Sequence, residues 1–174
     1  MITFRRATVA DAPTLSAFAR RMFDDTFGPH NEPADMKAYT TRAFSPATQA
    51  RELADPARAC LVAESDRDGT RAIAGYALLH VGSTDPCVTG PYPVEIERFY
   101  VDTPWHATGT AHTIMTRVME TALELEGETL WLGVWTHNPR AIAFYTKEGF
   151  VDVGEHSFVL GTDVQVDRVM ARPI

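Results

Sequence analysis

The clearest pattern of apolar positions in the sequence predicts a helix from about Thr110 to Leu125. Apolar residues recur there at the spacing of one helical face, with a period of about 3.6 residues. The stripe consists of Ala111, Ile114, Met115, Val118, Met119, Ala122 and Leu123. Gly127 follows the last apolar residue and is a suitable C-terminal stop. A strand over residues 94–101 precedes this helix, and a short loop joins the two.

Apolar runs and turn residues predict further elements on both sides of this unit. Strands are expected over residues 2–7, 60–64, 73–81, 129–134, 150–160 and 164–170. Helices are expected over about 8–26, 33–44 and 45–54, and again directly after Asn138. Asp68-Gly69 is a hairpin signal, and Gly75 within a strand indicates a bulge or a close approach. Strands that alternate with helices in the second half predict a mixed sheet with helices on its faces.

Capping residues define two of the shorter helices. Ser45 and Asn138 are both good N-cap residues. Each is followed by a proline at the first helical position, Pro46 and Pro139, where the missing N–H costs nothing. Gly149 then ends the second of these helices.

The loop between residues 102 and 111 has the composition of a phosphate-binding turn. Its last four residues, Thr108, Gly109, Thr110 and Ala111, are small, so a ligand can approach the backbone. The first N–H groups of a helix have no intrahelical partner, and the helix dipole makes that end positive. A phosphate group fits such an end. An ordinary strand-to-helix turn has the same composition, so the loop alone leaves both interpretations open.

Composition and charge indicate a soluble globular protein. The chain has 174 residues, of which 45% are hydrophobic and 22% charged. A net charge of −7 argues against nucleic-acid binding, which requires a basic surface. Cys60 and Cys87 have no metal-like spacing and make no disulfide framework. Neither a signal-peptide core nor a run of about 18 apolar residues is present. We therefore expect a cytoplasmic protein with no nucleic-acid or membrane partner.

Three motifs follow one another between residues 95 and 150. The first is RFYVD, residues 98–102, at the end of a strand. The second is the loop 106–111, and the third is N-x-x-A-x-x-F-Y-x-x-x-G-F, from Asn138 to Phe150. Together these motifs resemble the GNAT N-acetyltransferase superfamily, whose loop signature is (Q/R)-x-x-G-x-(G/A). The loop departs from that signature at its first position, which is His106 instead of Gln or Arg.

The resemblance implies that residues 1–174 form a single acetyltransferase domain. The fold class would be α/β (α+β): a GNAT-like, mixed, mostly antiparallel twisted sheet of about seven strands with helices on both faces. The sheet would be splayed between the strand that ends at Val101 and the strand that ends at Val134. Members of the family are often dimers, so a homodimer is the expected assembly.

The resemblance also implies acetyl-CoA as co-substrate. Backbone N–H groups of the loop would bind the pyrophosphate, and they are retained despite His106. Backbone groups of Phe99 and Val101 would pair with the pantetheine arm in the gap of the sheet. An N–H near Tyr100 or Val101 would stabilise the oxyanion of the tetrahedral intermediate. The residues expected to contact the cofactor are Phe99, Tyr100, Val101, His106, Ala107, Thr108, Gly109, Thr110, Ala111, His112, Asn138 and Tyr145.

Tyr145 is the expected general acid, because many family members have a tyrosine at this position that protonates the CoA thiolate. The alternative is that Tyr145 only packs on the sheet. Glu95 and Glu97 are the candidate bases; two residues apart on one strand, they share a face, and alternation places Phe99 and Val101 on that face too. A buried carboxylate would have a raised pKa suited to this work. Solvated surface carboxylates and a chain of waters remain alternatives.

The expected acceptor is the primary amine of a small molecule. The run from 149 to 170 resembles the end of bacterial spermidine/spermine-type acetyltransferases, which makes a polyamine or similar cationic amine the first guess. Alternatives are a peptide or protein amine, or a CoA-binding regulatory module without transfer activity. No metal is expected, because the histidines are not spaced as ligands: His80, His112, His137 and His156.

Overall fold

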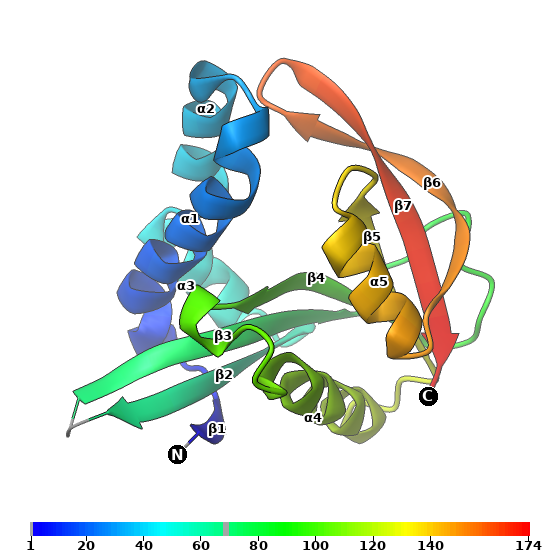
Figure 1. The fold of residues 1–174 in the computed structure, drawn as a ribbon. Helices are drawn as coiled ribbons and strands as arrows, with labels where there is room; N and C mark the ends of the chain where they lie inside the picture. Colours follow the sequence, from blue (N-terminus) through cyan, green and yellow to red (C-terminus); the bar gives the residue numbers. More distant parts are fainter. Residues whose placement is uncertain (1, 68–69) are drawn as a thin grey trace.

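The computed structural model describes residues 2–67 and 70–174, and within these residues the chain forms one seven-stranded sheet (Figure 1). The strand order is β1-β2-β3-β4-β5-β7-β6. Neighbours are antiparallel except β4 and β5, which are parallel. The strands are β1 (Ile2–Arg6), β2 (Arg58–Arg67), β3 (Thr70–Val81), β4 (Pro93–Val101), β5 (Thr129–Trp135), β6 (Val151–Leu160) and β7 (Asp163–Pro173). The turn expected at Asp68-Gly69 lies outside the described residues.

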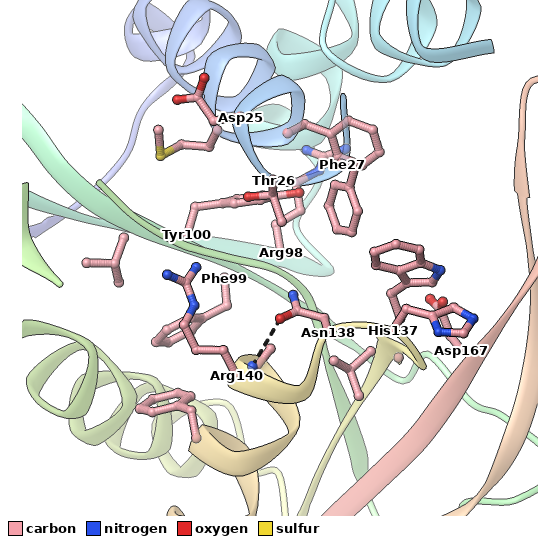
Figure 2. Close-up of a pocket in the computed structure, with 18 of the residues that line it drawn as sticks. Asp25, Thr26, Phe27, Arg98, Phe99, Tyr100, His137, Asn138, Arg140 and Asp167 are labelled. Carbon is pink, nitrogen blue, oxygen red and sulfur yellow. Dashed lines mark hydrogen bonds between the residues drawn. The ribbon is translucent and has the colours of Figure 1, made fainter. Parts of the chain in front are cut away.

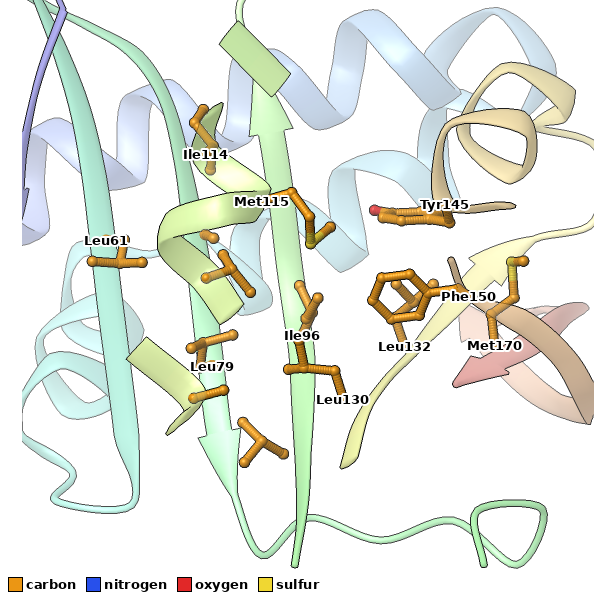
Figure 3. Close-up of a cluster of buried hydrophobic side chains, with 14 of the residues drawn as sticks. Leu61, Leu79, Ile96, Ile114, Met115, Leu130, Leu132, Tyr145, Phe150 and Met170 are labelled. Carbon is orange, nitrogen blue, oxygen red and sulfur yellow. The ribbon is translucent and has the colours of Figure 1, made fainter. Parts of the chain in front are cut away.

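Helices cover both faces of the sheet, as expected. They are α1 (Ala12–Phe27), α2 (Pro33–Ala43), α3 (Pro46–Ala54), α4 (Thr110–Glu124) and α5 (Pro139–Lys147). The group α1–α3 lies on one face, where Leu15 and Phe18 pack with Val62 of β2. Helices α4 and α5 lie on the other face, around the cluster shown in Figure 3. None of the described helices is long and apolar enough to cross a membrane.

The predicted caps are confirmed at two helices. The Ser45 side chain accepts a hydrogen bond from the Thr48 N–H at the start of α3. The Asn138 side chain accepts one from the Ala141 N–H at the start of α5. Gly149 follows α5 with φ of +88°, a left-handed conformation that glycine adopts without strain.

One position in the predicted stripe of α4 is wrong. Ile114, Met115 and Val118 are buried as expected, but Leu123 is 55% exposed. Thr121 is buried in its place, at 4% exposure. Thr121 and Ala122 are the i+3 and i+4 neighbours of Val118 and are both buried, whereas Leu123 is five residues on and falls at the solvent-facing edge of the helix. A hydrophobic pattern alone does not choose between Thr121 and Leu123.

The sheet is splayed between β4 and β5. In the described chain these two strands pair only at Pro93, Val94 and Glu95, opposite Thr129, Leu130 and Trp131. Beyond Glu95 the strands diverge toward their carboxyl ends, as Figure 1 shows. The expected splay is therefore confirmed, and it leaves the last half of β4 without a partner on one edge.

A bulge in β4 reverses the side-chain alternation of that strand. Its pairing with β3 shifts between Ile96 and Arg98, which leaves Glu97 as the extra residue. Phe99 and Val101 consequently pack in the same cluster as Ile96, on the face of α4 and α5. The expectation that they share a face with Glu95 is wrong, because strict alternation does not survive an inserted residue.

Gly75 lies at a close approach between β3, β4 and α4. A Cβ built on it would fall 2.6 Å from the Tyr100 carbonyl oxygen and 2.8 Å from Ile114 Cδ1. We expect Gly75→Ala to lower the free energy of unfolding by about 1–3 kcal/mol, the usual cost of overpacking a core. Urea denaturation would measure it. Gly28→Ala is the control, since no described atom lies within 4 Å of its built Cβ; an equal loss in both variants would contradict this account.

Candidate active site

The splay between β4 and β5 opens into a pocket of about 630 Å³ (Figure 2). One end lies between the loop before α4 and the start of α5, and the other lies under α1 and the β6–β7 hairpin. The structure brings many of the predicted residues to this pocket: Glu97, Phe99, Tyr100, Val101, His106, Ala107, Ala111, Asn138 and Tyr145. Other predicted residues are not part of its lining: Glu95, Thr108, Gly109, Thr110 and His112.

The loop before α4 has the backbone of an anion-binding turn. Ala107 and Gly109 both have left-handed φ values, +59° and +86°. Gly109 is the N-cap of α4, and its carbonyl accepts the first bond of the helix, from the Thr113 N–H. The N–H groups of residues 110–112 come before Thr113 in the chain. They therefore precede the hydrogen-bond ladder of the helix. This end of α4 can bind a phosphate group through backbone donors and the helix dipole.

The His112 side chain links α4 to α5. Its ring Nδ1 lies 2.9 Å from the Glu148 carboxylate, which is buried at the end of α5. The rest of the ring is exposed, so contact of His112 with a cofactor stays a prediction.

His106 connects the loop to β4 and to α5. Its Nε2 lies 2.8 Å from the Val101 carbonyl oxygen, and its Nδ1 lies 3.2 Å from Arg140 Nη1. A carbonyl accepts only, so Nε2 carries a proton, and Nδ1 accepts from the guanidinium. His106 therefore orients Arg140 along the wall of the pocket. Arg140 was not predicted; its position two residues after the N-cap was readable, but its approach to the loop depends on tertiary structure.

The backbone of β4 presents two residues to the open edge. The Asp102 N–H donates to the Ala74 carbonyl, and Tyr100 pairs with Tyr76 of β3. Hydrogen-bonding direction alternates along a strand, so Phe99 and Val101 point their backbone groups away from β3 and into the gap. The Val101 carbonyl is already bonded to His106. Of the predicted backbone donors, Val101 is therefore better placed than Tyr100.

Tyr145 lies in the wall of the pocket and packs tightly. Its side chain is 8% exposed, with the Phe99 ring 6.2 Å away in an edge-on arrangement. Figure 3 shows its hydroxyl directed from α5 toward β4. Burial raises the pKa of Tyr145, so the hydroxyl keeps its proton throughout the physiological range. The expected packing of Tyr145 on the sheet is therefore observed, and its role as an acid stays a prediction.

The two candidate bases are already engaged. Glu97 accepts hydrogen bonds of 2.9 and 3.0 Å from Arg58 and lies 3.2 Å from His80 Nδ1. Glu95 accepts a bond of 2.5 Å from the Ser83 hydroxyl, and burial raises its pKa. Glu95 lies outside the pocket lining, whereas Glu97 is within it.

His80, Glu95 and Glu97 also offer ligand atoms within 4.8 Å of one another, which is the spacing of a metal site. The Arg58 guanidinium neutralises Glu97 in this group, and that arrangement disfavours a divalent cation. These residues are better described as an ion-paired cluster that anchors β4.

The far end of the pocket contains residues that were not among the predicted site residues. Its walls are aromatic: Phe23, Phe27, Tyr39, Phe44, Trp135 and Phe158. Asp167 of β7 lies among them and is labelled in Figure 2. Burial raises the pKa of Asp167 to about 6. A buried acid among aromatic walls is a feature of tertiary structure, because these residues come from five separate elements.

Comparisons with known proteins agree with this geometry. The model of the acetyltransferase (GNAT) family matches residues 19–150. An uncharacterized N-acetyltransferase of Mycobacterium bovis is 34% identical over 166 residues, which cover 95% of this chain and 99% of the relative. An uncharacterized N-acetyltransferase of Lactobacillus delbrueckii subsp. lactis is 32% identical over 94% of this chain and 92% of the relative.

Solved structures share the fold. The PaiA N-acetyltransferase of Thermoplasma acidophilum, in complex with coenzyme A, superposes with a TM-score of 0.78 at 18% identity, covering 100% of this chain and 99% of that one. The spermidine/spermine N-acetyltransferase SpeG of Vibrio cholerae has a TM-score of 0.64 at 16% identity, covering 99% and 95%. The resemblance drawn from the three sequence motifs is thus confirmed, and the chain belongs to the GNAT family of acetyltransferases.

Proposed function

We propose that this acyltransferase moves an acetyl group from acetyl-CoA to the primary amine of a small cationic molecule. The proposal rests on three groups that lie around the gap between β4 and β5. The amide-rich N-terminus of α4, the free edge of β4 and the Tyr145 hydroxyl meet in one pocket. A thioester transfer needs these three things: a site for the phosphates, a polar edge for the arm, and a proton donor for the thiolate.

The donor would lie along β4. Its pyrophosphate would accept hydrogen bonds from the loop at residues 106–111 and the first turn of α4. Its pantetheine arm would pair with the open edge at Phe99, and the amide of Asn138 would contact the arm from α5. The Val101 N–H would stabilise the oxyanion that forms at the thioester carbonyl. The bound complex of the Thermoplasma protein supports this placement by its shared fold.

Tyr145 would donate its proton to the departing thiolate. The raised pKa keeps the hydroxyl protonated, so it can donate to the sulfur as the C–S bond breaks and negative charge develops there, and the proton released by the acceptor amine would restore the hydroxyl. Loss of the amine's proton would involve Glu95 through bound water, since Glu97 is held by Arg58.

A cationic acceptor is supported by the far end of the pocket, where Asp167 contributes a buried carboxylate. The Vibrio cholerae neighbour is named as acting on spermidine and spermine, and we propose a polyamine as the first acceptor to test. A peptide or protein amine is the second candidate. Location in the cytoplasm and assembly as a homodimer remain predictions.

Release of free CoA thiol tests the proposal. Purified protein would be incubated with acetyl-CoA and each of a set of amines, including spermidine, spermine, 2-phenylethylamine and a short peptide with a free N-terminus. Thiol release with at least one amine is expected. Binding of coenzyme A without release from any amine would instead favour a regulatory CoA-binding module.

Arg140 is expected to strengthen donor binding. It stands at the phosphate end of the pocket and is held there by His106. We expect Arg140→Gln to weaken the affinity for coenzyme A by about three- to tenfold, the effect of one exposed charge contact. Titration calorimetry would measure the dissociation constant. Arg117→Gln is the control, because Arg117 is exposed on α4 and pairs with Glu120; equal losses in both variants would contradict a phosphate contact.

A further inference from the structure

We propose that Asp167 is the counter-ion that binds the ammonium group of the acceptor, and that it selects cationic amines over acceptors that carry a carboxylate. This proposal rests on the proposed function and names the residue that recognises the second substrate. Asp167 lies in β7, at the opposite side of the pocket from the predicted bases on β4.

The carboxylate of Asp167 is buried and incompletely satisfied. The residue is 9% exposed, and its Oδ1 has no hydrogen-bond partner among the described residues. A buried polar atom without a partner is costly, and a buried charge more so. Because the side chain lines the pocket, a ligand that donates hydrogen bonds can remove this cost. An ammonium group provides both the donors and the opposite charge.

Among the described residues of the pocket wall, neither arginine pairs with Asp167. Arg98 also lines the pocket, but it is paired with Glu52 at 2.8 Å, and Arg140 is bonded to His106 at the other end. Burial is the main cause of the raised pKa of Asp167, and His156, opposite Asp167 on β6, acts in the other direction. The His156 Nδ1 is already bonded to Asp85, at 2.9 Å.

Gly133 keeps space for this arrangement. A Cβ at residue 133 would fall 2.6 Å from His156 Nε2 and 3.5 Å from Asp167 Oδ2. Glycine in the middle of β5 therefore allows the imidazole and the carboxylate to approach the strand. The floor of the pocket beside Asp167 is backbone, and a small cationic group can reach the carboxylate there.

Aromatic rings surround the site where the ammonium group would bind. Trp135 is directly opposite Asp167 in the β5–β7 ladder. Its ring lies 5.7 Å from Phe27, 5.6 Å from His30 and 5.3 Å from His137, measured between centroids. Aromatic faces attract cations and also contact the methylene groups beside them. An amine with an apolar chain fits these walls, whereas the carboxylate of an amino acid would be repelled by Asp167.

Asp167→Asn tests the proposal, because it keeps the shape and removes the charge. We expect the KM for spermidine, which can pair one ammonium group with Asp167 while another amine reacts, to rise by about 10- to 100-fold, the range for a hydrogen bond to a charged group. For 2-phenylethylamine, whose one nitrogen cannot react while it is held as ammonium, the dissociation constant is the quantity expected to rise. The KM for acetyl-CoA should not change. Asp152→Asn is the matched control: Asp152 is an exposed aspartate on β6 that pairs with Arg168, and the expected change there is negligible.

A pH profile separates a charge effect from a structural one. Since burial raises the pKa of Asp167 to about 6, the carboxylate becomes charged as pH rises through that value. The kcat/KM for the amine should therefore rise with pH across this range in the native enzyme. The part of this rise that comes from ionisation of Asp167 should be absent in Asp167→Asn. The other groups that face the site, His30, His137, His156, Asp25 and Glu97, are unchanged in the variant and cancel in the comparison.

Amine binding measured by calorimetry in the presence of coenzyme A distinguishes failure of this proposal from failure of the proposed function. Absence of thiol release from any amine would reject the transfer reaction. If spermidine nevertheless bound the native protein but not Asp167→Asn, the binding result would still support the anionic site. Equal affinity of the two proteins for both amines would overturn the role of Asp167. So would a native protein that binds neither amine.

Discussion

We expect the Gly109→Glu variant to lose all measurable binding of coenzyme A. Gly109 is the N-cap of α4, at the end of the loop where we place the pyrophosphate. No described atom lies within 4 Å of a Cβ built on it, so a side chain there projects into open space instead of the protein core. A glutamate would bring a negative charge to the position of a dianionic group, and it would cancel the positive potential of the helix end.

Gly109→Gln is the matched control for this variant. The φ of +86° at Gly109 is strained for any other residue, and glutamine shares that strain and the size of glutamate. Only the charge differs between the two variants. Titration calorimetry should detect coenzyme A binding to Gly109→Gln, weakened but measurable. Equal affinities in the two variants, or retained binding in Gly109→Glu, would show that the phosphates lie elsewhere.

Tyr145→Phe should lower turnover by about 10²- to 10⁴-fold, the usual contribution of a general acid. Phenylalanine keeps the ring that packs against Phe99 and Phe150, so the wall of the pocket is preserved. The affinity for coenzyme A should therefore change little. Single-turnover measurements of thiol release, combined with calorimetry, give the two quantities independently.

Tyr76→Phe provides a control for the loss of a buried hydroxyl. Tyr76 is 1% exposed and lies outside the pocket lining, and its hydroxyl has no partner within the described structure. Its removal should leave turnover unchanged. A large loss of coenzyme A affinity in Tyr145→Phe would assign Tyr145 to cofactor binding or packing. Native turnover in that variant would require a different proton donor.

The sequence predicted the parts of the fold that depend on neighbouring residues. Ser45 and Asn138 cap their helices because a short polar side chain next to a proline satisfies local N–H groups wherever the helix lies in the fold. The loop ending at Gly109 was predictable for a similar reason, since small residues before an amphipathic stripe define a helix end. The three motifs follow one another along the chain as β4, the loop before α4, and α5 do in the structure.

The features that the sequence did not reveal all depend on contacts between distant segments. The bulge at Glu97 arises from the pairing of β4 with β3, and residues 93–101 alternate too weakly to show it. Arg140 reaches the loop through His106, 34 positions away. In the sequence, Asp167 is not distinguished from other acidic residues on strands. Its burial depends on β5, β6 and the helices that surround it in the fold.

The extra residue in β4 also determines which sequence changes the site can accept. Substitutions between Ile96 and Phe99 alter one contact at a time. A deletion of Glu97 would restore a regular strand and keep Phe99 and Val101 on their present face, because each residue after the bulge keeps its partner on β3. The pattern of faces along β4 therefore accepts the loss of this residue, and what the loss removes is the carboxylate that pairs with Arg58.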